Sequence, residues 1–257
     1  MERATKKIWY GLKKAGAIEE LNIKTRRPLR DIADIEEYVA SRATAVIATS
    51  ENVRKELLAG GVKAENIHLI HNAIEDYWFD LPSQEFSSEP GIVFLGRLGN
   101  DAFTLKLKGL DRLIHLYQQF PDVKKTTFCM TTNKPVLSWL RSNIPKHSLC
   151  VNVQKDKLPE SFRPYRGSVL FIPSRYEGFS LSLIEGMSQG MVPVVYPIGV
   201  APEIIRNGEN GFVVFTQAQA IEKTRLLLAD KTLREKLATE AYKTAEQFTG
   251  KVIASKL

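Results

Sequence analysis

Apolar runs of strand length alternate with amphipathic segments of helix length along most of the chain. Buried parallel strands form continuous apolar runs, and such runs occupy residues 91–98, 126–131, 149–153, 168–173, 192–196 and 211–215. Helical patterns lie between them, and residues 217–248 fit two amphipathic helices. Strands that alternate with helices form βαβ units with right-handed crossovers. We therefore predict an α/β fold with a doubly wound, Rossmann-like parallel sheet.

The amino-terminal part of the chain shows a smaller α/β pattern. A helix is predicted at 28–41, a strand at 43–48, a helix that Ser50 caps, and a second strand at 67–70. Residues 81–90 are rich in Ser, Pro and Glu and lack periodicity, which indicates a linker. The predicted organisation is an amino-terminal segment at 1–80, a linker at 81–90, a ligand-binding domain at 91–235, and a carboxyl-terminal helix with a tail at 236–257.

Composition fits a soluble enzyme or a large part of one. The 257 residues are 44% hydrophobic and 25% charged, enough to bury one sizeable core. No apolar run approaches the roughly 20 residues that span a bilayer, and no signal-peptide core follows Met1, so we expect a cytoplasmic chain. Cys129 and Cys150 fall in apolar runs without other metal ligands at suitable spacing, which indicates reduced core residues.

The net charge of +7 is concentrated near the amino terminus, where basic residues are interleaved with Ile8, Trp9, Tyr10 and Leu12. Such a segment could lie on the anionic inner face of a membrane as a peripheral contact. An ordinary solvated helix face explains the same pattern and is slightly favoured. No nucleic-acid-binding motif accompanies the charge, so we expect no nucleic acid partner.

A strand, a loop and a helix start follow one another at 168–188, with two carboxylates in the loop and the helix. Gly178 would let the backbone turn tightly, and Ser180 or Ser182 could cap the helix, whose free N–H groups favour a phosphate. Glu177 and Glu185, eight positions apart, could bind hydroxyls on either side of that phosphate. A nucleotide sugar has this layout. The alternative is that Glu185 forms a capping box with Ser182 while Glu177 is solvated.

Two basic residues supplement this loop. Arg97 follows Gly96 at the end of the first predicted strand of the large sheet, and Lys108 precedes a helix. Arginine and lysine side chains bind phosphate oxygens well, and the alternative is that both residues are simply solvated.

Several segments carry a family resemblance together. They are Ser-Arg-Tyr-Glu-Gly-Phe-Ser-Leu at 174–181, Glu185, Val-Pro-Val-Val at 192–195, and Pro-Glu-Ile-Ile-Arg-Asn-Gly-Glu-Asn-Gly-Phe-Val-Val at 202–214. In this order they closely resemble the donor domain of group 1 retaining glycosyltransferases of the GT-B fold, whose hallmark is two Glu separated by seven residues. The resemblance covers roughly residues 44–215.

The resemblance implies a role for each site residue. Glu185 would hold the ribose, Glu177 would contact the donor sugar as the catalytic residue, and the diphosphate would be bound by Gly96, Arg97, Lys108, Gly178, Phe179, Ser180 and Leu181. Lys106 is an alternative to Lys108, because the loop before it is longer than the family's commonest form. Backbone groups at 154–158 would contact the base. His71 lies at the junction between domains, where backbone hydrogen bonds are expected to hold it.

The sequence therefore predicts a metal-independent retaining hexosyltransferase that needs no cofactor. It would move a sugar from a UDP-, GDP- or ADP-sugar to a saccharide or lipid-linked acceptor in glycan or cell-surface polysaccharide synthesis. The absence of an Asp-x-Asp pair agrees with a site without metal. Residues 1–80 would be the last part of an acceptor domain, so its apolar face would be partly uncovered and open to a dimer or a partner subunit.

Two alternatives stay open. A glycoside hydrolase also uses paired carboxylates, but these flank one bond at roughly 5 to 10 Å. A non-catalytic subunit that binds a nucleotide sugar would need a partner to supply the acceptor domain. The family's full enzymes have an acceptor domain nearly as large as the donor domain, so we expect this chain alone to bind donor but to transfer sugar poorly.

Overall fold

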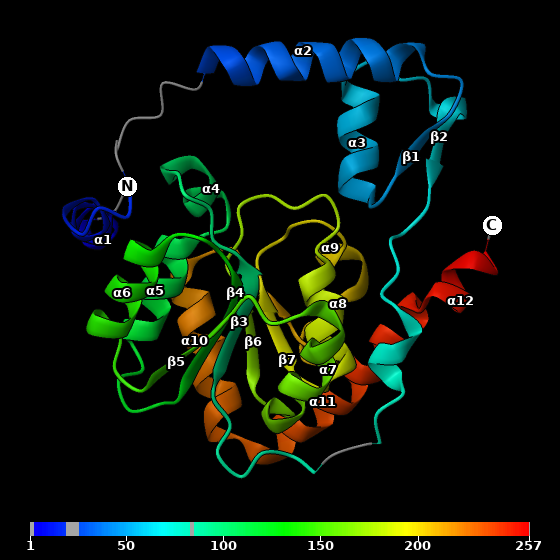
Figure 1. Cartoon of the computed structure of the whole chain (residues 1–257). Helices are drawn as coiled ribbons and strands as arrows, with labels where there is room; N and C mark the ends of the chain where they lie inside the picture. The colour runs from blue at the N-terminus through cyan, green and yellow to red at the C-terminus, as the bar shows by residue number, and fades with distance from the viewer. Residues whose placement is uncertain (1–2, 19–25, 83–84, 257) are drawn as a thin grey trace.

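The computed structural model describes residues 3–18, 26–82 and 85–256. Its centre is a six-stranded parallel sheet with the strand order β5-β4-β3-β6-β7-β8 (Figure 1). The strands are β3 (Ile92–Arg97), β4 (Lys125–Met130), β5 (His147–Val151), β6 (Val169–Ile172), β7 (Val192–Val195) and β8 (Phe212–Val213). The predicted doubly wound α/β sheet is therefore confirmed, with most strands a residue or more shorter at their ends.

The chain enters this sheet in the middle and winds outward in both directions. From β3 it passes to β4 and β5 on one side, then returns to β6, which pairs with β3 on the other side. In register, Ile92 of β3 is paired with both Lys125 of β4 and Val169 of β6. The strand order reverses between β3 and β6, and the carboxyl ends of strands at such a switch point form the crevice where ligands bind.

Helices cover both faces because right-handed connections that lead in opposite directions lie on opposite faces. Contacts place α5, α6 and α10 together on one face and α8 with α11 on the other. The helices of this domain are α4 (Ala102–Leu107), α5 (Leu110–Gln118), α6 (Lys134–Asn143), α7 (Leu158–Phe162), α8 (Leu181–Ser188), α9 (Ala201–Ile204), α10 (Gln217–Ala229), α11 (Lys231–Ala245) and α12 (Gly250–Ala254). Short 3-10 turns lie at η3 (Lys155–Lys157), η4 (Arg163–Tyr165) and η5 (Glu246–Phe248).

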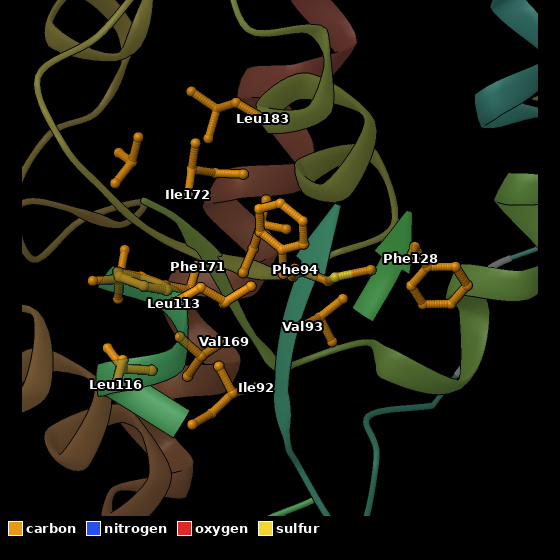
Figure 2. Packing of buried hydrophobic residues seen from close by; sticks show 14 of the residues in the cluster. Ile92, Val93, Phe94, Leu113, Leu116, Phe128, Val169, Phe171, Ile172 and Leu183 are labelled. Carbon is orange, nitrogen blue, oxygen red and sulfur yellow. The ribbon is translucent and has the colours of Figure 1, made fainter. Parts of the chain in front are cut away.

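The core lies on both faces of β3 and β6. All residues of β6 and β7 are buried, as expected for central parallel strands covered on both sides. Figure 2 shows side chains of β3 and β6 in one cluster with Leu113 and Leu116 of α5 and Leu183 of α8. This packing fixes the carboxyl ends of β3 and β6 and the start of α8 relative to one another.

The amino-terminal helix α1 (Arg3–Lys14) packs on the large domain. It contacts α5 and α6, and Ile8, Trp9 and Leu12 are buried in the main core. These apolar side chains are therefore not free to enter a membrane surface, and a peripheral membrane contact through the basic residues of this segment stays a prediction. The structure agrees with the alternative, a helix whose basic side is solvated: Lys6, Lys7, Lys13 and Lys14 are exposed. None of the described helices is long and apolar enough to cross a membrane.

A small second unit follows α1. It comprises α2 (Arg26–Arg42), β1 (Val46–Ala48), α3 (Glu51–Ala59), η1 (Ala64–Asn66) and β2 (Ile67–Leu69), with β1 and β2 paired in parallel. Ala48, Val62 and Ile67 form its own small core. Several large apolar side chains on this unit are more than half exposed: Ile35, Tyr38, Val39 and Ile47. Uncovered apolar side chains were expected for this segment. Figure 1 shows the unit above the main sheet, with α2 across the top.

Two segments of the chain meet at the junction between the small unit and the large domain. The chain runs from β2 through η2 (Asp76–Phe79) towards β3, and the carboxyl-terminal segment returns to it, because the Ile74 N–H donates to the Phe248 carbonyl at 2.9 Å. The division at residues 80 and 90 stays a prediction, whereas residue 235 lies within α11 (Lys231–Ala245).

Candidate functional site

A cavity of about 570 Å³ lies at the carboxyl ends of β3, β4 and β5 and at the amino-terminal end of α8. This is the switch point of the sheet, where a ligand site is expected. The cavity is lined by all the predicted site residues except Gly178, namely Gly96, Arg97, Lys108, Glu177, Phe179, Ser180, Leu181 and Glu185. Residues separated by up to 89 positions are thus brought together as predicted (96 to 185).

The start of α8 faces the cavity with unpaired polar groups. Ser180 precedes the helix in a left-handed conformation (φ 82°, ψ 70°), and its buried hydroxyl has no hydrogen-bond partner among the described residues. The first N–H groups of a helix also lack intrahelical partners and attract anions. The serine hydroxyl and the helix end therefore form a site suited to a phosphate oxygen.

Two expectations about this loop are wrong. Neither Ser180 nor Ser182 caps α8, because the Ser180 side chain accepts no helix N–H and Ser182 lies inside the first turn. The capping box of Ser182 and Glu185 is therefore not formed. Gly178 does not make the tight turn either: a Cβ at this position would meet Thr49 Oγ1 at 3.8 Å, an ordinary contact, and the left-handed residue is Ser180.

Glu177 is held rather than solvated. Its carboxylate accepts hydrogen bonds from Lys108 Nζ at 2.7 and 2.9 Å and from Ser174 Oγ at 2.8 Å. Lys108 is positioned by Gly109, whose φ of 71° and close approach to the Pro173 carbonyl leave no room for a Cβ, which would lie 2.1 Å from that oxygen. The first carboxylate of the pair is therefore fixed in the cavity wall before any ligand is present.

Arg97, the second basic residue of the cavity, is not held by a carboxylate in the way that Lys108 is. Arg97 is exposed at the end of β3, and its Nη2 lies 3.9 Å from the Met130 sulfur. No carboxylate forms an ion pair with Arg97 in the part of the chain that the structure describes. Lys106 does not line the cavity, whereas Lys108 does. Arg97 can therefore turn its guanidinium to a bound anion without breaking an ion pair.

Glu185 lies in a different environment from Glu177. It is 8% exposed, and burial raises the pKa of its carboxyl from 4.5 to about 7, with Lys155 opposing and Glu75 adding to the rise. The Lys155 ammonium itself pairs with Glu75, which comes from the junction between the two units. A buried carboxyl without an ion-pair partner of its own favours a neutral ligand group that donates hydrogen bonds, such as a ribose hydroxyl.

The loops after β4 and β5 close the other side of the cavity. Asn152, at φ 53°, accepts from the Thr131 N–H at 2.9 Å and donates to the Thr131 carbonyl at 3.0 Å. This side-chain bridge joins the loops after β4 and β5. Lys155 lies in the predicted base-contacting range 154–158 and lines the cavity. Asn152 was not singled out from the sequence, although a residue with a short amide at the end of a strand is typical of a left-handed position.

Three further expectations are corrected or refined. Cys129 and Cys150 are both free thiols, but both line the cavity, and Cys150 is only half-buried. His71 is held by a side chain, since its Nε2 lies 3.0 Å from Glu203 Oε2. The expected backbone hydrogen bonds are therefore not what fixes its ring, which also packs near the rings of Phe179 and Phe248. Within the described ranges, no three His, Cys, Asp or Glu side chains cluster as metal ligands.

Comparison with known proteins assigns the family. The profile of the family described as glycosyl transferases group 1 matches residues 81–244. The chain belongs to this family. The chain is 24% identical over 237 residues to the sulfoquinovosyl transferase SQD2 of Arabidopsis thaliana, covering 86% of the chain and 44% of SQD2. It is 22% identical over 228 residues to the alpha-maltose-1-phosphate synthase of Mycolicibacterium smegmatis, covering 76% and 54%. The chain thus spans about half the length of these curated relatives.

Solved structures share the fold of this chain. The sucrose-phosphate synthase from Thermosynechococcus elongatus superposes with a TM-score of 0.76 at 18% identity, covering 95% of this chain and 64% of that one. Anabaena Alr3699/HepE in complex with UDP-glucose gives a TM-score of 0.70 at 20% identity, covering 87% and 65%. The predicted family and the predicted Rossmann-like fold are both confirmed.

Proposed function

We propose that this chain carries the donor site of a retaining hexosyltransferase that moves a sugar from a nucleotide sugar to a saccharide or lipid-linked acceptor. The observation that carries the proposal is one cavity that combines an anion site at the start of α8, the exposed cation Arg97 and the buried carboxyl of Glu185. No metal or cofactor is invoked: Arg97 and the start of α8 offer uncompensated positive charge to a diphosphate, and Lys108, whose charge Glu177 offsets, also lines the cavity.

Each part of a nucleotide sugar has a counterpart along this cavity. Glu185 accepts hydrogen bonds from the ribose hydroxyls, and the loops after β4 and β5 lie beside the base. The diphosphate meets Arg97, Lys108 and the N–H groups from Phe179 to Leu181, and Glu177 faces the sugar. Breaking the sugar–phosphate bond places negative charge on the departing diphosphate, and donors already aimed at that position stabilise it.

The relatives support a sugar donor of this kind. SQD2 and the alpha-maltose-1-phosphate synthase are transferases or synthases of sugar compounds by name, and the HepE structure contains UDP-glucose. UDP-sugars are therefore the first donors to test, followed by GDP- and ADP-sugars. Synthesis of a glycan or cell-surface polysaccharide is the process in which we place the reaction.

A second candidate is a nucleotide-sugar-binding subunit that transfers sugar only with a partner. The observation that favours it is the exposure of large apolar side chains on the small unit, Ile35, Tyr38 and Val39 on α2 and Ile47 on β1. In a GT-B enzyme, transfer takes place between two domains, and holding both reactants in place is worth roughly 7 to 11 kcal/mol. A chain that offers one wall of that cleft would bind donor and transfer little sugar.

Calorimetric titration of UDP, GDP and ADP tests the donor site. Arg97→Ala should weaken binding of the preferred nucleoside diphosphate by about 1.5 to 3 kcal/mol, the range for hydrogen bonds to charged groups. Arg225→Ala is the matched control, because Arg225 is exposed on α10 outside the cavity. Equal affinities for the parent and the Arg97 variant would show that the phosphates lie elsewhere.

The two carboxylates should respond to different parts of the donor. Glu185→Ala should weaken binding of the free nucleotide, whereas Glu177→Ala should spare the nucleotide and reduce the additional affinity for UDP-glucose. The same loss of UDP affinity in both variants would contradict the division of roles. Incubation with UDP-glucose and saccharide or lipid-linked acceptors then separates the two candidates: acceptor-dependent transfer by the chain alone would reject the binding subunit.

A further inference from the structure

The carbonyl of Gly178 receives two hydroxyl groups from the small unit. Ser50 Oγ donates to this oxygen at 2.7 Å, and Thr49 Oγ1 donates to it at 3.2 Å. Both residues lie between β1 and α3, 128 and 129 positions away along the chain. A carbonyl oxygen has two lone pairs, so these hydroxyls use its full accepting capacity.

A peptide group is planar and trans, so the carbonyl of one residue and the N–H of the next point in opposite directions. Gly178 turns its carbonyl to α3 and does not line the cavity, whereas Phe179 does line it. The Phe179 ring is engaged with His71 and Phe248, at centroid distances of 6.0 and 5.9 Å. The backbone of Phe179, and with it the N–H of this peptide, is therefore the part of the residue available to a ligand.

The next peptide is fixed from the other side. The Phe179 carbonyl accepts from the Val200 N–H at 3.0 Å, and a Cβ on Gly199 would lie 2.3 Å from that carbonyl. The same loop is tied to α3, since Asn52 Nδ2 donates to the Gly199 carbonyl at 3.1 Å. The Glu51 N–H also donates to Glu203 at 2.8 Å. The phosphate-facing loop is thus clamped between the start of α3 and the loop after β7.

We propose that Thr49 and Ser50 are positioning residues for the donor: by donating to the Gly178 carbonyl they hold the Phe179 N–H towards the sugar-phosphate end of the nucleotide sugar. They do not touch the donor themselves. This inference rests on the proposed function and goes beyond it, because it makes a segment outside the donor domain determine the geometry of the donor loop. If the two hydroxyls only held the two units together, removing them would not change the ratio of the affinities for different donor ligands.

Two substitutions remove the hydroxyls with little effect on local structure. Ser50 also caps α3, where its Oγ accepts from the Val53 N–H at 3.3 Å, and glycine replaces a serine cap at a cost of only a few tenths of a kcal/mol. Ser50→Gly therefore mainly removes the donor to Gly178. Thr49→Val keeps the shape of the side chain. Ser50→Thr keeps a hydroxyl and should restore the parent behaviour, and Asn52→Ala cuts a clamp contact that does not involve Gly178.

The probes are UMP, which lacks the second phosphate and the sugar, and UDP-glucose. In the Thr49→Val, Ser50→Gly double variant we expect UDP-glucose affinity to fall roughly 5- to 20-fold, the effect of losing one or two net hydrogen bonds, while UMP affinity stays unchanged. Asn52→Ala should lower the unfolding temperature without changing the ratio of the two affinities. A double variant with the parent's ratio would overturn the proposal.

A second readout does not depend on the choice of donor. In protein labelled with 15N-phenylalanine, with Phe179→Leu used for assignment, pyrophosphate should shift the Phe179 amide resonance of the parent chain and shift it less in the double variant. A parent resonance that does not respond to pyrophosphate would overturn the positioning role. A parent that responds to pyrophosphate but binds no UDP-, GDP- or ADP-glucose would instead contradict the proposed function.

Discussion

Glu185 should make the stability of the ligand-free chain depend on pH in a way that Glu185→Gln abolishes. Burial raises the pKa of this carboxyl from 4.5 to about 7 in the folded chain. A group whose pKa is higher in the folded than in the unfolded state binds its proton more tightly when folded. Its contribution to stability is therefore fully present below pH 4.5 and is lost as the pH rises through 7.

The magnitude follows from the difference between the two pKa values. One pKa unit corresponds to about 1.4 kcal/mol, so the rise from 4.5 to about 7 amounts to about 3 kcal/mol once the carboxyl is fully ionised. At pH 5 Glu185 of the folded chain keeps its proton, and the stability lost relative to low pH is below about 1 kcal/mol. A glutamine carries no charge at either pH. The stability of Glu185→Gln relative to the parent should therefore increase by about 2 to 3 kcal/mol between pH 5 and pH 8.

Urea unfolding followed by tryptophan fluorescence at the two pH values measures this difference. Glu65→Gln serves as the control, because Glu65 is an exposed carboxylate in η1 outside the cavity. Its stability relative to the parent should be nearly the same at pH 5 and pH 8. If the relative stability of Glu185→Gln also stayed the same at the two pH values, the pKa of Glu185 would not be raised by burial, and this explanation of its difference from Glu177 would be wrong.

Three further outcomes are expected. Lys155→Ala removes the cation that lowers the pKa of Glu185, so UDP affinity measured by calorimetry should fall at pH 7 and recover towards pH 8.5; equal loss at both values would indicate a direct contact with the nucleotide instead. Gly109→Ala should destabilise the chain by at least about 2 kcal/mol in urea unfolding, because the left-handed φ of 71° and the Pro173 carbonyl both exclude a Cβ. Trp9→Ala should cost about 3 to 5 kcal/mol, as for other buried aromatic side chains, and a negligible change would mean that α1 does not dock on α5 and α6 in solution.

The sheet and most of the site were predictable because their signals are local. Strands β6 and β7 are buried throughout and so appear as continuous apolar runs. Glu177 in the loop after β6 and Glu185 in α8 both lie within a few positions of the start of that helix. Strand ends were less certain: β8 was expected at 211–215 and occupies only Phe212–Val213. The apolar run continues through Val214, which is buried and donates to the Val195 carbonyl at 2.8 Å, and ends with Phe215, which is exposed.

Contacts between distant segments were not predictable in the same way. The sequence around Lys155 does not indicate that Glu75, 80 positions earlier, pairs with it. The amphipathic pattern of α1 requires an apolar surface but does not distinguish a membrane from the outer side of α5 and α6. The left-handed Ser180 is a comparable case, because a non-glycine residue adopts that conformation only when the surrounding structure imposes it.

The two carboxylates of the cavity are held in opposite ways, and this determines what an incoming nucleotide meets. Glu177 lies 2.7 Å from Lys108 and offsets its charge, so a diphosphate first finds Arg97 and the start of α8. Glu185 has no such partner within residues 3–18, 26–82 and 85–256, and with its pKa raised to about 7 it is largely protonated below that pH. Ribose hydroxyls that donate to Glu185 favour its ionised form and so lower its pKa in the complex.

Nucleotide binding should therefore release a proton from Glu185 when the pH lies at or somewhat below 7. A proton taken up by the buffer contributes the buffer's own heat of ionisation. UDP-glucose, whose diphosphate diester does not titrate near neutral pH, should then give different binding enthalpies for the parent at pH 6.5 in MES and in imidazole, and equal ones for Glu185→Gln if that variant still binds measurably. Equal enthalpies in both buffers for the parent would mean that the ribose hydroxyls do not draw on Glu185, because a neutral carboxyl that stays neutral exchanges no proton on binding.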